Sequence, residues 1–267
     1  MSLALLAYLA LGAAAGVLAG LLGIGGGLVL VAALVWLLPS QGIPAAMAVH
    51  VALATALASI VLTGMSSSWA HHRRGSVLWP SVAWLLPGVL VGGWLGSLLA
   101  TQLDGGLLRT FIAIYCYLAA LQLGLDWPRS RTQRPDAPLG PAYTAAGAGI
   151  GAISALVGIG GGSMTVPLLV WRGVRPVLAV GTSSACGVAI ALAGATGYAA
   201  HGPAAGVLPP GSWGYVFLPA AAAIALASVL TAPLGTRLAH RISGLALRRL
   251  FAGFLVVVGT SLWWTLN

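Results

Sequence analysis

Apolar residues form long runs along this chain, and short polar stretches separate them. The runs cover residues 2–38, 45–70, 77–100, 107–125, 141–171, 177–199, 213–235 and 246–266. A run of about 20 apolar residues matches the thickness of the hydrocarbon layer of a membrane, and several of these runs carry no charge. Because backbone groups in lipid must be satisfied within the segment, runs of this length predict helices and not the weakly alternating strands of a barrel.

Glycines interrupt the first and the fifth run. The stretch GIGGG at residues 23–27 returns as GIGGG at residues 158–162, and the tails that follow it, to Trp36 and Trp171, agree at most positions. Polyglycine is unfavourable inside a continuous helix. The chain is therefore an internal duplication, in which backbone without side chains is needed at membrane depth.

The duplication divides the chain into a first membrane repeat, residues 1–125, a polar linker, residues 126–139, and a second membrane repeat, residues 140–267. Four segments repeat in order, and residues 50–53 are expected to be the counterpart of residues 181–184. The matches that support this alignment are Pro44 with Pro176, Pro87 with Pro219, Leu95-Gly96 with Leu234-Gly235, and Leu108-Arg109 with Leu247-Arg248.

The arginines indicate how the repeats cross the membrane. If all eight segments cross, the arginines divide almost evenly between the two sides, against the usual bias of basic residues toward one side. If each glycine-broken segment is a re-entrant hairpin, eleven arginines face one side of the membrane and Arg109 alone faces the opposite side. We therefore expect an all-α polytopic membrane protein of two inverted-topology repeats, each a re-entrant helical hairpin plus three spanning helices.

Segment lengths agree with the hairpins in part. The outgoing arms, residues 28–38 and 163–171, are each about half a bilayer long. The incoming arm, residues 2–22, is long enough to span the membrane, so its length does not agree with a half-helix.

Composition excludes a soluble protein. The chain has 59% hydrophobic and 6% charged residues and a mean hydropathy of +1.00, whereas soluble domains carry about 25% charged residues. The net charge of +9 comes from arginines in short loops, which indicates membrane topology and no nucleic-acid partner. The first run lacks a preceding basic residue and a clear cleavage site, so it is expected to belong to the fold. Cys116 and Cys186 lie in apolar runs and are expected to be packing residues without a disulfide.

The two glycine tips are the predicted substrate site. Successive N–H groups at such a turn can hold an anion, and the half-helix that begins there presents a partial positive charge. The predicted substrate-binding residues are Gly25, Gly26, Gly27, Gly160, Gly161, Gly162, Ser163, Thr165, Thr182, Ser183, Ser184 and His50. The alternative is that the glycines only allow close helix packing and that each hydroxyl bonds to its own helix. Catalytic residues, a metal site and a cofactor are not expected.

Acidic residues are scarce, which limits the classes of solute that the protein could transport. The chain has no Glu, and Asp104, Asp126 and Asp136 fall in loops or at segment ends. A permease for cations or metals would need carboxylates or clustered His and Cys inside the bilayer. A small anion is therefore favoured as the solute. An intramembrane hydrolase is the rival from another class, with Ser163 as nucleophile and a distant histidine, by elimination His201, as base.

Three features together resemble the TauE/SafE family of sulfite exporters. They are the repeated GIGGG, the segment Gly181-Thr182-Ser183, and the loop AHHRRGSV at residues 70–77. The chain departs from the family pattern at Ala32, where the second copy has Pro167, at residues 50–52, and in the short loop 200–203.

The resemblance implies an inner-membrane permease for sulfur-containing anions such as sulfite, sulfonates, sulfoacetate or thiosulfate, with its arginine-rich loops in the cytoplasm. A permease for another small anion, such as a carboxylate, is the alternative. The expected partners are the anion, the lipid bilayer and a second copy in a homodimer.

Overall fold

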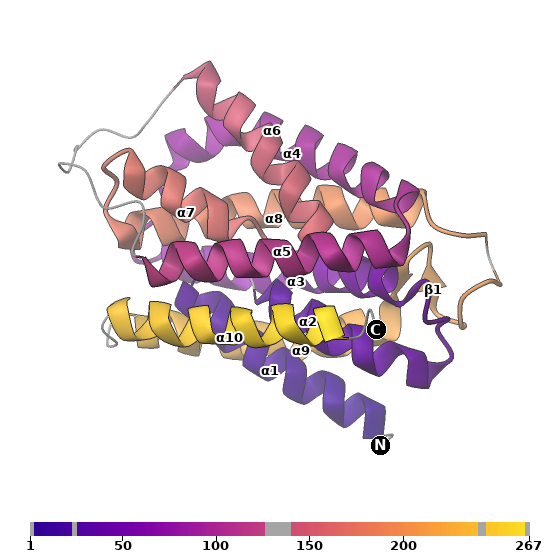
Figure 1. The fold of residues 1–267 in the computed structure, drawn as a ribbon. Helices are drawn as coiled ribbons and strands as arrows, with labels where there is room; N and C mark the ends of the chain where they lie inside the picture. The colour runs from indigo at the N-terminus through magenta and orange to yellow at the C-terminus, as the bar shows by residue number, and fades with distance from the viewer. Residues whose placement is uncertain (1–2, 23–25, 126–139, 205, 240–243, 265–267) are drawn as a thin grey trace.

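The computed structural model describes residues 3–22, 26–125, 140–204, 206–239 and 244–264, and its helices lie roughly along one direction (Figure 1). Gly25 and the linker at residues 126–139 lie outside the described residues. The first repeat contains α1 (Leu3–Leu22), α2 (Gly27–Leu37), the short 3₁₀ helix η1 (Leu38–Gln41), α3 (Ala48–His72), α4 (Trp79–Gln102) and α5 (Gly105–Gly124). The second contains α6 (Pro141–Val157), α7 (Gly162–Trp171), α8 (Pro176–Ala200), β1 (Ser212–Trp213), β2 (Val216–Phe217), α9 (Leu218–Ala239) and α10 (Gly244–Trp264).

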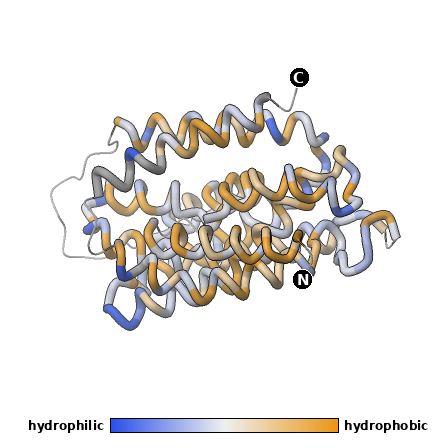
Figure 2. The backbone as a smooth tube through the Cα atoms, turned by 90° about the horizontal axis from the view of Figure 1, so that it is seen from below, coloured by the Kyte–Doolittle hydropathy of each residue, from blue (hydrophilic) through white to orange (hydrophobic). Residues whose placement is uncertain are grey.

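Six helices in the described ranges are long and apolar enough to cross a membrane, which confirms the prediction of an all-α polytopic membrane protein. They are α1, α3, α4, α5, α8 and α9, whereas α2, α6, α7 and residues 252–263 of α10 form shorter apolar helices. The only strands in the described ranges are β1 and β2, a small antiparallel hairpin between α8 and α9. Hydrophobic residues cover the middle of the helices, and hydrophilic residues gather toward their ends (Figure 2).

Helices α3 and α8 occupy the same place in the two repeats and run antiparallel to each other. Near the start of α3, Thr55 Oγ1 accepts a hydrogen bond of 3.1 Å from the N–H of Phe217, which follows α8. Near the start of α8, Gly181 packs against the carbonyl oxygen of Ser76, which follows α3. Each helix therefore begins at the level where the other ends.

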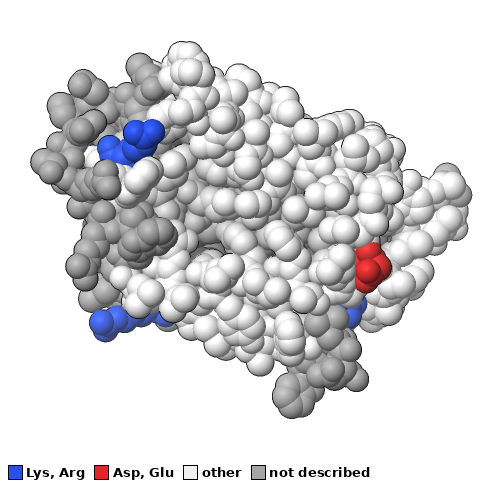
Figure 3. Space-filling view, turned by 45° about the horizontal axis from the view of Figure 1, so that its top comes forward, with Lys and Arg blue, Asp and Glu red and all other residues white. Residues whose placement is uncertain are grey.

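Arginines mark one end of the helix bundle. Arg73 and Arg74 follow α3, and Arg172 and Arg175 lie between α7 and α8, so these four share what we call the arginine end. Asp104 caps the start of α5 at the opposite end, which we call the Asp104 end; its carboxylate accepts the N–H groups of Gly106 and Leu107, each at 2.9 Å. Basic residues gather on the left of Figure 3 and the acidic patch lies on the right.

Helices of each repeat pack mainly against helices of the other repeat. Helix α1 of the first repeat packs along α9 of the second, and α6 of the second packs along α4 of the first. Helix α3 packs on α8, and α5 packs on α10. Every one of these contacts has a counterpart when the two repeats are interchanged, so the internal duplication in the sequence is also a duplication of the packing.

Glycines let α4 and α6 lie with their backbones in contact. Gly88, Gly92 and Gly96 occur at four-residue intervals on one face of α4 and pack against carbonyl oxygens of α6. A side chain at any of these positions would overlap the α6 backbone. Close approach through small residues is the usual way in which membrane helices associate, because lipid supplies no hydrophobic driving force between them.

The prolines correct part of the sequence alignment. Pro176 is the first residue of α8 as predicted, but Pro44 lies in a turn ahead of α3, which begins at Ala48. Pro219 is the second residue of α9 and Pro80 is the second residue of α4, whereas Pro87 lies inside α4. The first turn tolerates proline because its N–H groups have no partner in the helix, so Pro80 is the counterpart of Pro219.

Both cysteines are free and buried, as expected. Cys116 lies on α5 and Cys186 on α8.

Candidate substrate site at the two glycine breaks

The helix that follows each glycine break starts against the helix that precedes the break. Gly26, at the start of α2, packs against the backbone of Ala15 in α1. Gly161, at the start of α7, lies beside Ser154 of α6, where an added Cβ would be 3.4 Å from the hydroxyl oxygen. The outgoing helix of each pair therefore begins beside the incoming one.

The two hairpin tips meet at the middle of the bundle. Gly27 packs against the carbonyl oxygen of Gly158, so the backbones of the two breaks are in direct contact. Ile60 lies halfway along α3, where a Cβ on Gly27 would come within 3.0 Å of its Cδ1. Gly187 lies halfway along α8 and contacts Gly160.

Both outgoing helices begin with the same backbone geometry. Gly26 has φ 63° and ψ 8°, and Gly161 has φ 71° and ψ −2°, a left-handed conformation that glycine adopts without strain. Neither α2 nor α7 has a side-chain cap at this end. The first N–H groups of a helix have no partner within it and carry a partial positive charge, so two positive helix ends lie at the centre of the molecule.

A small cavity lies beside the second tip. Its lining comes from both repeats: Ala19, Ile60, Gly64, Ser67, Gly160, Ser184 and Gly187. The space open to the centre of a water molecule is about 10 Å³, which is about enough for one water. Ser67 Oγ donates a hydrogen bond of 3.4 Å to Ser184 Oγ across this cavity, and Ser184 Oγ donates to the carbonyl oxygen of Val180 at 3.1 Å.

Further hydroxyl groups surround the start of α7. Ser163 Oγ is hydrogen-bonded to the hydroxyl of Tyr115, which reaches it from α5. Ser154 and Thr165 are 0% and 1% exposed, and their hydroxyls have no hydrogen-bond partner in the described part of the chain. Buried polar groups are nearly always satisfied, so these hydroxyls could each bond to a water or a solute at the second tip.

Thr182 stabilises the fold across the two repeats. Its Oγ1 accepts a hydrogen bond of 2.9 Å from the N–H of Leu78, which leads into α4. Thr55 accepts the N–H of Phe217, which leads into α9, in the same way. Thr55 is therefore the counterpart of Thr182, and residues 50–53 are not the counterpart of residues 181–184 as the sequence alignment had it. Ser183 is buried and makes contacts of its own.

His50 lies in the first turn of α3, about 15 Å along the helix from Ile60 at the tips. Its Nε2 is 3.2 Å from the carbonyl oxygen of Ala100 and 3.0 Å from that of Leu103, and its ring stacks on Tyr215 at 5.2 Å. The ring therefore holds the end of α4 at the Asp104 end of the bundle. The structure does not bring His50 together with the other predicted site residues.

Ser163 and His201 are also far apart. His201 caps the end of α8, about 20 Å along that helix from Gly187 at the tips. Its Nδ1 is 2.9 Å from the carbonyl oxygen of Gly197. The geometry therefore provides no nucleophile and base pair from these two residues. Within the described ranges, no three His, Cys, Asp or Glu side chains group together in a way that could hold a metal ion.

Sequence reasoning missed Tyr115, Ser67 and Ser154. Ser67 is the middle one of three consecutive serines, residues 66–68, near the end of a long apolar segment, and Tyr115 is far from the glycines in sequence. Ser154 had a local signal, because it precedes the second glycine break by one helical turn.

An all-α bundle of membrane-spanning helices, with two broken helices meeting at its centre, defines a polytopic membrane transport protein. The Sulfite exporter TauE/SafE family matches residues 8–262, and the chain belongs to this family. It is 35% identical to a probable membrane transporter protein of Haemophilus influenzae, over 97% of both chains.

Two further relatives carry the same description. The chain is 30% identical to probable membrane transporter protein YunE of Bacillus subtilis, over 76% of this chain and 82% of the relative. It is 24% identical to a probable membrane transporter protein of Methanocaldococcus jannaschii, over 91% and 90% of the two chains. No solved structure matches the chain significantly. The family and these names indicate a transporter and not an enzyme.

Proposed function

We propose that this protein is a permease for small sulfur-containing anions of the sulfite, sulfonate or thiosulfate class, bound between the two glycine tips. The observation that carries the proposal is the cavity at the tips, whose lining combines Ser67 of the first repeat with Gly160, Ser184 and Gly187 of the second. Hydroxyl groups and backbone N–H groups are donors suited to oxyanions. The family description, sulfite exporter, supports the sulfur chemistry.

The lack of an acidic side chain among the described residues at the tips supports an anion over a cation. The positive starts of α2 and α7 and the negative ends of α1 and α6 lie together at the breaks, so helix dipoles alone do not decide the sign. Asp104 is the acidic residue within the described ranges, and it lies at a helix start far from the tips. An anion entering this site gains hydrogen bonds to uncapped N–H groups and meets no carboxylate. A carboxylate anion fits the same donors and is the alternative substrate class.

The size of the cavity supports alternating access. Room for about one water is too little for an oxyanion with several heavy atoms, so the described conformation is a closed one. Opening requires the tips of α1–α2 and α6–α7 to separate, and each hairpin packs along a long helix of the other repeat. We propose that the hairpins are re-entrant, that the repeats have inverted topology, and that rocking of one repeat against the other exposes the site to each side in turn.

The arginine distribution sets the proposed orientation. Among the arginines that the structure describes, Arg109 alone lies at the Asp104 end. The bias of basic residues places the arginine end in the cytoplasm, and the bacterial and archaeal relatives support a cell inner membrane.

Flux into proteoliposomes tests the function. Purified protein is reconstituted, and uptake of labelled sulfite, thiosulfate, a short sulfonate and a short carboxylate is compared with that of protein-free vesicles. We expect protein-dependent flux of at least one sulfur anion that exceeds the carboxylate flux. Faster flux of the carboxylate would select the alternative, and absence of flux for every anion would overturn the proposal.

Gly160→Ala tests the site itself. A Cβ there would lie 3.4 Å from Ile60 Cγ2 and 3.6 Å from Gly187 Cα, which are ordinary contacts, so the variant is expected to fold while losing cavity space. Gly149→Ala is the matched control, because a Cβ on Gly149 meets nothing within 4 Å. Flux should fall in the first variant and stay normal in the second.

A further inference from the structure

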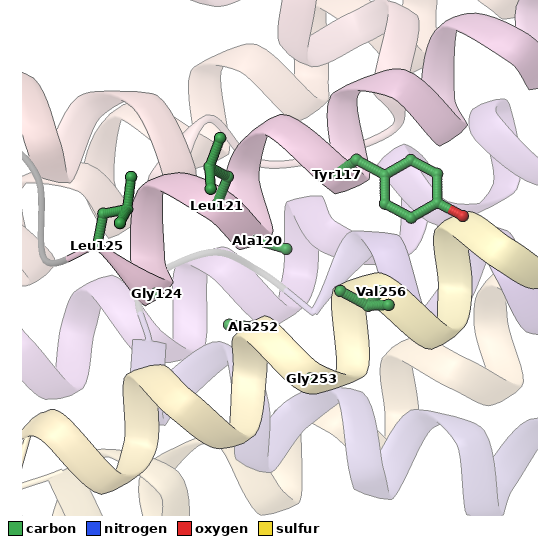
Figure 4. A pocket seen from close by; sticks show the side chains of 8 residues that line it. All are labelled: Tyr117, Ala120, Leu121, Gly124, Leu125, Ala252, Gly253 and Val256. Carbon is green, nitrogen blue, oxygen red and sulfur yellow. The ribbon is translucent and has the colours of Figure 1, made fainter.

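A surface groove separates α5 and α10 at one end of their contact (Figure 4). Its volume is about 440 Å³, and its lining is apolar apart from one tyrosine hydroxyl: Tyr117, Ala120, Leu121, Gly124, Leu125, Ala252, Gly253 and Val256. Ala120 on α5 and Ala252 on α10 lie on facing sides of the gap in Figure 4. Small side chains therefore leave a channel between two helices that are otherwise packed together.

The groove is a wedge that is open at the arginine end. At its narrow end, Tyr117 Oη and Thr260 Oγ1 are hydrogen-bonded at 2.9 Å, and a Cβ on Gly259 would lie 3.3 Å from the carbonyl oxygen of Ala113. At its wide end, a Cβ on Gly124 or Gly253 would meet nothing within 4 Å. Because α5 ends and α10 begins at the arginine end, the wedge narrows from the membrane surface toward the middle of the bilayer.

A positive charge stands at the mouth of this wedge. Arg249 is exposed and precedes Gly253 by one helical turn, so the two residues share a face of α10. Helix α10 begins at Gly244, and the start of a helix also favours an anion. A molecule that fills the apolar wedge and pairs with the positive charge at its open end therefore has an apolar tail and an anionic head.

We propose that the α5–α10 groove binds an anionic phospholipid, with one acyl chain in the wedge and the phosphate on Arg249. The charge at Arg249 favours a phospholipid over a second copy of the protein as the occupant of the groove. A symmetric dimer across the groove would place two Arg249 side chains at the same depth near each other, where like charges repel, whereas a phosphate neutralises Arg249. The site lies on the outer surface of α5 and α10, so it does not depend on the proposed transport function.

Native mass spectrometry of the full chain tests the proposal. Protein released from nanodiscs that contain equal amounts of phosphatidylglycerol and phosphatidylcholine should retain phosphatidylglycerol preferentially. Gly253→Leu, which fills the wedge, should remove this retained lipid. Arg249→Gln should weaken titrated phosphatidylglycerol binding about fivefold, the contribution expected of one basic residue at a membrane surface.

Two matched controls keep the test specific. Gly149→Leu places a leucine at an exposed helical glycine of α6, where nothing lies within 4 Å, and Arg175→Gln removes another exposed arginine of the same end. Both should retain lipid as the unmodified protein does. Equal retention of the two lipids, or unchanged retention in Gly253→Leu and Arg249→Gln, would overturn the proposal. Loss of a dimer in Gly253→Leu with unchanged lipid would assign the groove to a second copy instead.

Discussion

Gly27 of the first glycine break packs directly on the carbonyl oxygen of Gly158 in the second, so the two halves of this transporter meet backbone to backbone. A side chain at this point has nowhere to go, because the neighbouring Ile159 Cα would lie 3.0 Å from a Cβ on Gly27. The requirement for glycine here comes from tertiary contact between segments more than a hundred residues apart.

We expect Gly27→Ala to destabilise the protein and to stop transport. Forcing a methyl group against a backbone carbonyl costs about 1–3 kcal/mol in a packed core. Thermal unfolding in detergent and anion flux in proteoliposomes measure the two effects. Gly149→Ala serves as the control, and a Gly27→Ala protein with normal stability and flux would show that the tips are apart in the membrane.

Ser184→Ala and Ser67→Ala should weaken anion binding. Each removes a hydroxyl that lines the cavity, and a hydrogen bond to a charged group contributes about 1.5–3 kcal/mol, so the KM for the anion should rise about tenfold or more. Ser66→Ala is the matched control on the same helix, because the Ser66 hydroxyl bonds to the carbonyl oxygen of Val229 at 3.0 Å and lies outside the cavity lining. An equal rise of KM in all three variants would argue against a binding site at this cavity.

Tyr115 and Ser163 should behave as a coupled pair. Tyr115→Phe leaves the buried Ser163 hydroxyl without its partner, which costs about 1–3 kcal/mol of stability. In the double variant with Ser163→Ala both hydroxyls are absent, so the loss should be smaller than the sum of the two single losses. Thermal or denaturant unfolding of all four proteins measures the coupling, and simple additivity would refute the contact.

Thr55 and Thr182 should have equal structural roles. Thr55→Val or Thr182→Val leaves a backbone N–H, of Phe217 or Leu78, without its acceptor, and each should lower stability by about 1–3 kcal/mol. Thr55→Ser and Thr182→Ser keep the hydroxyl and should retain most of the stability. If the valine variants unfold at the same temperature as the serine variants, the hydroxyls do not serve as acceptors.

Cysteine labelling tests the hairpin in the membrane. Leu3→Cys, at the start of α1, and Ser40→Cys, after α2, should react with an impermeant maleimide from the same side as Asp104→Cys, and Arg74→Cys should react from the other side. Cys116 and Cys186 are buried and should stay unreactive, so the parent protein is its own control. Labelling of Leu3→Cys and Ser40→Cys from opposite sides would show that the first glycine-broken segment spans.

The duplication, the eight apolar segments and the two broken helices could be predicted from the sequence because each depends on local composition. A GIGGG stretch inside an apolar run breaks a helix wherever the run is placed. The lengths of the runs likewise decide how far each helix reaches, and the predicted segments agree with the helices within a few residues at most ends.

Which side chains meet at the centre could not be predicted in the same way. Hydropathy distinguishes the inner face of a soluble helix, but a membrane helix is apolar all round, so its pattern does not say which face meets a neighbour. His50 was predicted as a site residue and instead contacts the end of α4, while Tyr115, which the sequence did not single out, reaches Ser163.

The sequence by itself determined that this chain is a duplicated membrane protein with two bare-backbone breaks. Only the tertiary structure decided that the breaks touch, that Thr55 and not Val51 mirrors Thr182, and that Ser67 lies across a cavity from Ser184. The physical reason is that local chain chemistry sets where a helix starts and stops, whereas the rotation and depth of each helix follow from close packing between segments distant in sequence.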